Sequence, residues 1–214
     1  MKKALNIMAA LVLGGAMVAV PASAGVVLTF DGTPTNNTYD NIPTFPYLIS
    51  INGGTPVDMM CDDVLTEITP GESWNANAYS LTAANLPDFK FGADGLTDYE
   101  EAAWIETGVV KGTIASGDGN AAVWSIFDPS FNTTIDHSAI NAILNNAANA
   151  VAAGNLNYSG ITIYTPNPFN SAQEMIFGTV TPNCPKAPEP ATSAMLGGGL
   201  LALGFLGRRL RQRS

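Results

Sequence analysis

The chain has 214 residues, with 18 acidic and nine basic side chains and a formal net charge of −9. Six of the basic residues lie within the first three or the last seven positions, so residues 25–186 carry three lysines against 17 acidic side chains, a formal charge of −14. A polyanionic duplex would repel so acidic a stretch, and we therefore expect no nucleic-acid partner. Its length suits one domain with a hydrophobic core of its own.

The N-terminal 24 residues have the three parts of a secretory signal. Two lysines supply the positive start, and the uncharged apolar stretch 4–20 follows. A proline then breaks the helix, and Ala22 and Ala24 place small side chains at the third and first positions before the expected cut. We predict a signal helix that is cleaved after Ala24, so that Gly25 becomes the mature N-terminus. The alternative is a retained membrane anchor, which the glycine pair inside the stretch disfavours.

Short strands are expected at both ends of the domain. Three β-prone runs, 26–30, 47–51 and 64–68, are separated by turn-forming clusters of Gly, Pro and Asn such as DGTPTNN and NGGTP. Two further runs, 161–165 and 174–180, follow the helical centre of the chain.

Three helices are expected between these strands. Thr97 and Glu100 have capping-box spacing, so the first helix should begin there and run to Gly108. Asp118 can cap a second helix that ends before Pro129, and this helix is apolar on nearly all sides and should be buried. Two tryptophans, Trp104 in the first helix and Trp124 in the second, are expected to be core anchors.

The third helix, 136–153, has the clearest pattern. Its apolar residues recur in one continuous stripe, asparagines line the other side, and Gly154 stands at the expected C-cap. The stripe consists of Ile140, Ile143, Leu144, Ala147, Ala148 and Val151. The order of strands, helices and strands predicts an α+β fold, with about three helices packed against a mainly antiparallel sheet.

A second uncharged apolar stretch, 191–207, lies near the C-terminus. At about 1.5 Å per helical residue it spans about 26 Å, the short end of a membrane-spanning helix. Pro188, Glu189 and Pro190 precede it, and a basic end, 208–214, follows it. The basic residues are Arg208, Arg209, Arg211 and Arg213. Since basic residues prefer the cytoplasmic side, this transmembrane helix should run with its N-terminus outside.

Together these C-terminal features resemble the PEP-CTERM sorting signal, over about residues 187–213. Proteins with this signal are substrates of exosortase, a membrane-embedded cysteine protease-transpeptidase of Gram-negative bacteria, and they often accompany exopolysaccharide production. The resemblance implies export by the Sec machinery, a transient stay in the inner membrane, recognition at residues 188–190, and release or attachment at the cell surface. Exopolysaccharide or a biofilm matrix is then a candidate partner. The domains implied are a signal peptide at 1–24, an extracytoplasmic domain at 25–180, a Pro-rich linker at 181–187 and a sorting tail at 188–214.

The body also resembles a domain of PEP-CTERM proteins that is related to the thioester domains of Gram-positive surface adhesins. The matching pieces are residues 60–63, 99–105 and 120–128, with a weaker match at 173–175. In those adhesins a cysteine bonds to a glutamine just before a tryptophan-bearing helix, and the thioester captures surface nucleophiles. The resemblance puts Cys61 at the cysteine position, but it puts Asn120 at the glutamine position.

Asn120 weakens the case for a thioester. The thiolate must attack a side-chain amide and expel ammonia, and an Asn carbonyl falls about 1.5 Å short of where Gln reaches. The body has one glutamine, Gln173, and nothing in the sequence places it beside Cys61. We favour a buried Cys61 in an inherited fold, with a thioester-type covalent adhesin as the alternative. A disulfide to Cys184 also stays open, because export leads to an oxidising compartment and so long a loop would gain about 4.7 kcal/mol.

Other catalytic and metal-binding sets are weak. The neighbours Asp136 and Ser138 would not converge on His137 as a catalytic triad does, and one histidine with two distant cysteines makes no zinc site. Four acidic residues near the first helix lack EF-hand spacing, which leaves calcium binding open. They are Asp94, Asp98, Glu100 and Glu101. We expect no cofactor and no enzymatic activity, and instead an exported surface or extracellular-matrix protein with a structural or interaction role.

Overall fold

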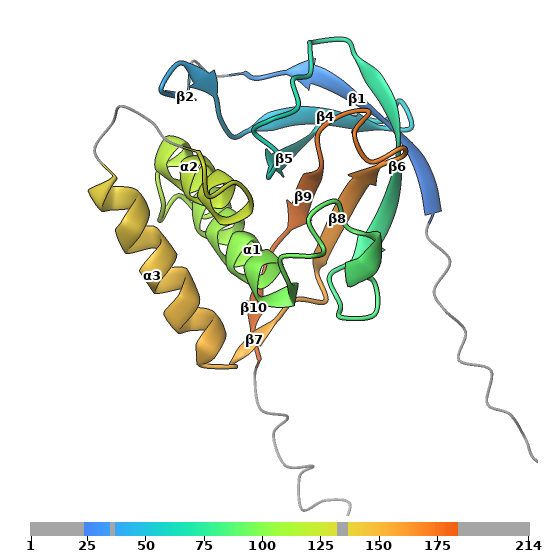
Figure 1. Cartoon of the computed structure of the whole chain (residues 1–214). Coiled ribbons are helices and arrows are strands. Elements are labelled where there is room, and N and C mark those ends of the chain that lie inside the picture. The colour runs from blue at the N-terminus through green and yellow to red at the C-terminus, as the bar shows by residue number, and fades with distance from the viewer. Residues whose placement is uncertain (1–23, 35–36, 132–136, 184–214) are drawn as a thin grey trace, which may run out of the picture.

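The computed structural model describes residues 24–34, 37–131 and 137–183. The stretch before residue 24, the sorting motif at 188–190, the stretch 191–207 and the arginines after it lie outside these residues, as does Cys184. Among the helices of the described residues, none is long and apolar enough to cross a membrane. The predicted fold class is confirmed, because an antiparallel sheet packs against three helices (Figure 1).

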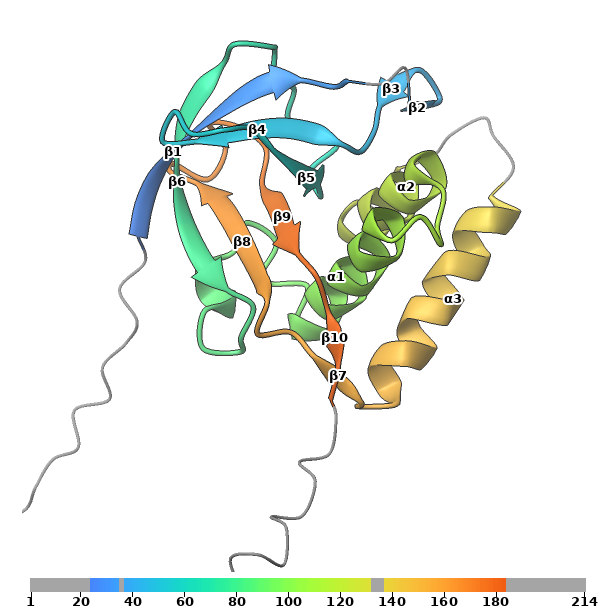
Figure 2. The same ribbon diagram turned by 180° about the vertical axis from the view of Figure 1, so that it is seen from behind.

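Six strands close into an antiparallel barrel in the order β1-β4-β5-β9-β8-β6. They are β1 (Ala24–Gly32), β4 (Tyr47–Ile51), β5 (Val57–Cys61), β6 (Ser73–Ser80), β8 (Ile161–Pro166) and β9 (Met175–Gly178). Two short pairs lie beside the barrel: β2 (Thr38–Tyr39) with β3 (Ile42–Pro43), and β7 (Leu156–Asn157) with β10 (Thr181–Pro182). The helices α1 (Leu96–Val110), α2 (Ser116–Phe127) and α3 (Ser138–Ala152) stack on one side of it, as Figure 2 shows from behind.

Four of the five predicted strands are confirmed, and the run 64–68 is wrong. This segment is a loop, and Leu65 at its tip is 73% exposed. The Asp63 carboxylate accepts the backbone N–H groups of Leu65 and Thr66, each at 3.2 Å, and so turns the chain away from an extended course. The strand in this region is β5 instead. The structure adds β6, whose Asn- and Ala-rich sequence has little β-propensity.

The barrel interior follows from alternation along the strands. In β6, Trp74 and Ala76 are buried inside while Asn75 faces outward, as the period of two in a strand requires. Large apolar side chains from all six strands fill the interior, including Leu28, Ile49 and Met59.

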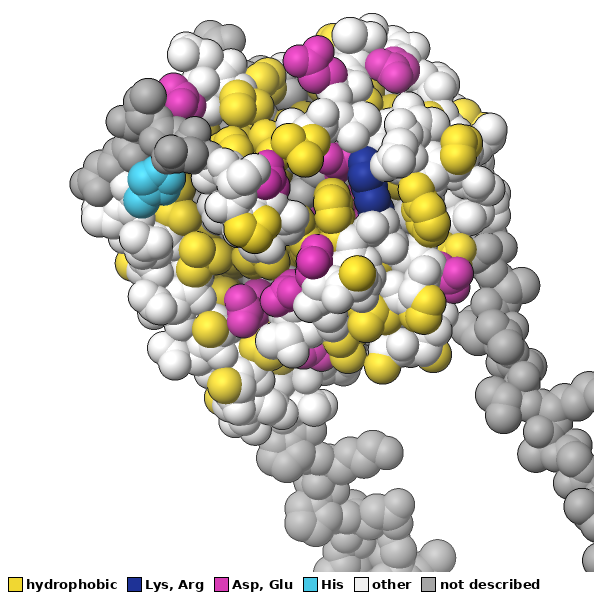
Figure 3. Space-filling model, viewed as in Figure 1, with side chains coloured by type: hydrophobic (Ala, Val, Ile, Leu, Met, Phe, Trp, Pro, Cys, Tyr) yellow, Lys and Arg dark blue, Asp and Glu magenta, His cyan; other side chains and the backbone are white. Residues whose placement is uncertain are grey.

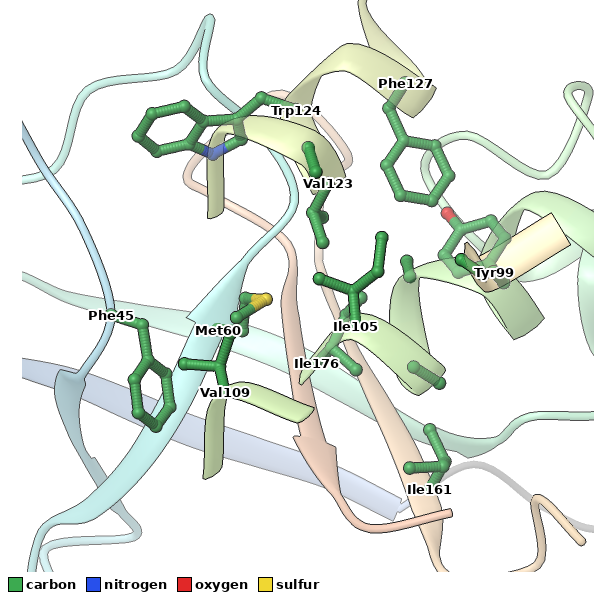
Figure 4. Packing of buried hydrophobic residues seen from close by; sticks show 14 of the residues in the cluster. Phe45, Met60, Tyr99, Ile105, Val109, Val123, Trp124, Phe127, Ile161 and Ile176 are labelled. Carbon is green, nitrogen blue, oxygen red and sulfur yellow. The ribbon is translucent and has the colours of Figure 1, made fainter. Parts of the chain in front are cut away.

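Opposite faces of the same strands build a second core against the helices. Met60 of β5 and Ile176 of β9 face Ile105 of α1, and Val123 of α2 lies in the same cluster (Figure 4). Cys61 and Met175, the next paired residues, belong to the barrel interior instead. The β5–β9 pair therefore separates the two cores.

The helices differ from prediction mainly at their N-termini. Helix α1 begins before Thr97, with Gly95 at the N-cap in a backbone conformation of φ 122°, so the capping box is wrong. Asp118 lies inside the first turn of α2 rather than at its N-cap, which is Ala115. The buried character of α2 is confirmed, and Trp124 is 1% exposed. Trp104 of α1 is only partly buried.

Helix α3 presents the predicted stripe to the other two helices. Ile140 and Ala147 are buried, Leu144 is partly buried, and Ala148 at the edge of the stripe is exposed. Gly154 adopts φ +67° and its N–H donates to the Val151 carbonyl at 2.9 Å, which confirms the predicted C-cap.

Candidate functional site around Cys61

Cys61 is the last residue of β5, opposite Met175 of β9, and its side chain is completely buried in the barrel interior. It is a free thiol. The Sγ atom donates to the Asp63 carbonyl at 3.2 Å and accepts from the Asp63 backbone N–H at 3.3 Å. The turn that follows β5 thus wraps closely around the sulfur.

Burial is the main influence that raises the pKa of the Cys61 thiol, and the negative charges of Asp62 and Asp63 raise it further. The Asp63 N–H and the indole of Trp124 oppose this shift, although the indole N–H does not reach hydrogen-bond geometry with any acceptor. The balance leaves a protonated thiol. Because the thiolate is the reactive form, Cys61 is a weak nucleophile in this setting.

Asn120 lies next to Cys61, on the buried face of α2. Its Nδ2 donates to the Cys61 carbonyl oxygen at 2.8 Å, and its Oδ1 accepts from the Phe45 backbone N–H at 2.9 Å. The structure therefore brings together the two residues that the resemblance pairs. The contact runs through the backbone of Cys61 and not through its sulfur, so the amide ties α2 to β5 and to the start of β4.

Gln173 lies two residues before Met175, the strand partner of Cys61. Its Nε2 donates to the Thr66 carbonyl at 2.6 Å, and its Oε1 has no hydrogen-bond partner among the described residues. The sequence could not place this glutamine near β5. Its donor group is directed at the loop after Cys61, and it holds that loop against the barrel.

A cluster of buried ionisable groups adjoins Cys61 on the helical side of the β5–β9 pair. Asp62, Asp63 and Glu174 are at most 1% exposed. Lys90 forms an ion pair with Asp63 and also donates to Thr66 Oγ1 at 2.9 Å. This pairing compensates two charges that would be costly to bury alone.

Glu174 accepts three hydrogen bonds. The donors are the Tyr99 hydroxyl at 2.5 Å, the Thr165 hydroxyl at 2.5 Å and the Lys90 backbone N–H at 2.9 Å. Burial raises the pKa of Glu174, and these donors act against the increase. Burial and the neighbouring carboxylate also raise the pKa of Tyr99, so its hydroxyl stays a neutral donor.

Asp62 completes the cluster as the protonated member of a carboxyl pair. Burial raises its pKa well above the usual range, and the charges of Glu174 and Asp63 add to this, while Lys90 lowers it. No described residue donates a hydrogen bond to either Asp62 oxygen, and the neighbouring group is the Glu174 carboxyl. A proton on Asp62 turns that contact into a hydrogen bond to Glu174. The carboxyl pair thus shares one proton and keeps one negative charge, and the Tyr99, Thr165 and Lys90 donors bind the Glu174 side of it.

The other sequence-predicted residues are not drawn into this site. His137 stands at the N-cap of α3 and Ser138 begins that helix, while Asp136 lies outside the described residues. Across the described ranges, no group of three or more His, Cys, Asp or Glu residues could hold a metal ion. Asn183, the neighbour of Cys184, donates to the Asn155 carbonyl beside the β7–β10 pair. The disulfide between Cys61 and Cys184 stays a prediction.

The fold and the site together define an α+β domain with a closed six-stranded barrel, in which Cys61 and the carboxyl groups of Asp62, Asp63 and Glu174 are buried. No family model matches the chain, and no curated protein matches it. The N-terminal domain of the Streptococcus pyogenes pilus tip adhesin Cpa is similar in structure, with a TM-score of 0.43 and 13% sequence identity, over 76% of this chain and 97% of that domain. At this identity and TM-score, the adhesin's activity does not carry over to this chain.

Proposed function

We propose that the protein is an exported, non-enzymatic surface or extracellular-matrix protein of a Gram-negative bacterium, sorted by exosortase through its C-terminal segment. The observation that carries the proposal is the extent of the fold. The described strands run from Ala24 to Pro182, so the predicted cleavage after Ala24 falls at the first residue of the folded body, and the sorting motif that starts at Pro188 follows its last strand. Cleavage after Ala24 would remove only the first residue of β1, and removal of the sorting tail would leave every described strand whole.

The state of the reactive groups supports the non-enzymatic part of the proposal. The Cys61 thiol is buried and protonated, and the Glu174 carboxylate accepts hydrogen bonds from Tyr99, Thr165 and Lys90. A general acid or base must reach a substrate, and a group enclosed in this way cannot. These buried residues therefore stabilise the domain, and a partner would bind to side chains on its surface.

Figure 3 shows the surface that the domain presents on one face, where acidic side chains are scattered and basic ones are scarce. Within the described residues the lysines are Lys90, which is partly buried in its ion pair, and Lys111. A surface of this charge suits a soluble extracytoplasmic domain that stays apart from anionic polymers.

The test of sorting is the substitution Glu189→Ala in the producing bacterium. Wild type should lose the arginines of its tail and reach the surface, whereas Glu189→Ala should accumulate in the inner membrane as a heavier form. Fractionation with antibodies against the body and against the tail measures both, beside a strain that lacks the sorting protease. Glu67→Ala, an exposed change within the body, is the matched control and should be sorted normally. A mature surface form that retains Arg208–Arg213 would show that the tail is an ordinary membrane anchor.

A covalent adhesin that uses Cys61 is the second candidate: Asn120 lies beside Cys61, with its amide on the Cys61 carbonyl and not on the sulfur. Formation of a thioester expels ammonia and lowers the intact mass by about 17 Da. The mass of the mature protein from its own host decides between the two candidates: an unchanged mass supports the non-covalent one.

A further inference from the structure

Two adjoining hollows lie on the outer face of the barrel, with volumes of about 380 and 320 Å³. They share Asn77 and Asn167 in their linings, so they form one elongated depression, which we call the asparagine groove. Asn52 and Asn75 line its first half, and Asp88 and Phe169 line its second half. Figure 1 shows the strands β1 and β6, which carry the first half, side by side.

Strand register sets the spacing of the asparagines. Trp74 and Ala76 point into the barrel, so Asn75 and Asn77 face outward two residues apart, on the groove side. Asn167 extends the line of β8, and its backbone N–H donates to the Asn75 carbonyl at 2.8 Å. Three carboxamides therefore sit on neighbouring strands of a rigid barrel.

These carboxamides are not used within the fold. The side chains of Asn75, Asn77 and Asn167 make no hydrogen bond to any other described residue, whereas Asn52 Oδ1 accepts from the Val27 N–H at 2.8 Å. Asn75 and Asn167 are exposed, and Asn77 is half-buried. Each free carboxamide offers two donors and an acceptor to whatever occupies the groove.

Phe169 adds an apolar surface at one end. Its side chain is 49% exposed, and it lies at the tip of a turn in which the Ser171 backbone N–H and hydroxyl both donate to the Pro168 carbonyl, at 3.0 and 2.7 Å. The turn holds the ring beside the amides. Among the side chains of the lining, Asp88 is the charged one, and no lysine or arginine is present.

We propose that the asparagine groove binds a neutral oligosaccharide, whose hydroxyls meet the carboxamides and one of whose rings packs on Phe169. Amides that both donate and accept match hydroxyl groups, which do the same. The negative charge of Asp88 disfavours phosphates and acidic sugars at the Phe169 end of the groove. An added peptide strand is disfavoured too, because β6 is paired on both sides, with β1 and with β8. The proposal rests on the proposed function for its setting, an interaction role outside the cell.

The experiment uses the full chain in a zwitterionic detergent without a sugar headgroup. Linear hexasaccharides of glucose, N-acetylglucosamine, mannose and galactose are presented on an array, beside hexagalacturonate as an acidic probe. Binding of at least one neutral probe is expected, and calorimetry then gives its Kd. Asn77→Ala and Phe169→Ala should each weaken that binding by about tenfold.

Matched controls separate the groove from general surface effects. Asn145→Ala removes an exposed asparagine of α3, and Leu65→Ala removes an apolar side chain that is 73% exposed outside the groove. Both should bind as wild type does, and circular dichroism should show all four variants folded. Absence of binding to every neutral probe, binding to hexagalacturonate alone, or equal Kd values for Asn77→Ala and Asn145→Ala would overturn the proposal. If the groove fails these tests while the tail is processed normally, the oligosaccharide proposal is wrong and the sorting proposal stands. If a neutral probe binds as expected while the mature protein retains its tail, the sorting proposal is wrong and the oligosaccharide proposal stands.

Discussion

The carboxyl group of Glu106 is completely buried on α1, and neither of its oxygens has a hydrogen-bond partner within the described residues. It lines a hollow of about 430 Å³ with Phe45, Phe177 and Asp58. Burial raises its pKa well above 4.5, and the nearby Gly178 N–H only partly opposes this. Folded Glu106 therefore keeps a proton that the unfolded chain releases, so its contribution to stability is fully present below the unfolded pKa and is lost as pH rises.

The substitution Glu106→Gln removes this proton and keeps the shape of the side chain. Between the unfolded and folded pKa values, one such group costs about 1.4 kcal/mol of unfolding free energy for each pH unit. The stability of Glu106→Gln relative to wild type should therefore grow by about that amount from pH 5 to pH 6. Buried Asp62 and Glu174 add a slope of the same sign to both proteins, and it cancels in the difference.

Urea titrations followed by circular dichroism, at half-unit steps of pH, measure this difference. Glu67→Gln removes one negative charge from an exposed position and serves as the control. Parallel stability curves for wild type and Glu106→Gln would refute the reasoning, since they would mean that Glu106 holds the same number of protons folded and unfolded.

The remaining predictions concern packing, the site and the N-terminus. Leu144→Ala on the partly buried stripe of α3 should destabilise the domain by about 2 kcal/mol, the low end for such truncations, while Asn145→Ala on the exposed side should leave the melting temperature unchanged. Asn120→Ala leaves the buried Phe45 N–H and the buried Cys61 carbonyl without hydrogen-bond partners, and should lower the free energy of unfolding measured in urea by about 2–5 kcal/mol. A decrease below about 1 kcal/mol would mean that the Asn120 amide does not stabilise the fold. The mature protein should begin at Gly25 in N-terminal mass mapping, and surface-exposed protein that still begins at Met1 would contradict this.

The hydrophobic pattern of the sequence was enough to predict the helices and strands whose own apolar side chains pack them into the core. The stripe of α3 and the uninterrupted apolar sequence of α2 both match the burial seen in the structure. The run 47–51 corresponds to β4 residue for residue. In each case the pattern that identifies the element is also the pattern that packs it.

Local β-propensity did not predict the strands correctly where a side-chain hydrogen bond or a partner strand far away in the sequence determines the backbone conformation. The β-prone run 64–68 became a loop because Asp63 binds its backbone, and β5 formed just before it because it pairs with β9. Strand β6 was missed because its Asn and Ala residues have little β-propensity, although the alternation of apolar Trp74, Ala76 and Ala78 with asparagines is visible once the barrel is known.

The site was predictable in part. The resemblance pointed to Cys61 and Asn120, and the structure brings them into contact. The matched pieces 60–63 and 173–175 were also noted, but their adjacency depends on the register of two strands far apart in the chain. No local signal reports such a register, so Asp62, Glu174 and Lys90 could not be grouped from the sequence.

The buried acidic cluster explains how that register is held. Side chains along β5 and β9 alternate between the barrel interior and the helical side, and Cys61 faces the interior while Asp62 faces Glu174 on the other side. A slip of one residue would turn Asp62 or Glu174 into the apolar barrel interior, away from Lys90 and from the Tyr99 hydroxyl that now binds Glu174. A buried ion pair or shared proton adds little to stability by itself, yet breaking it is costly. The cluster therefore acts by penalising the wrong pairing, and it fixes the strand pair on which both cores of the domain are built.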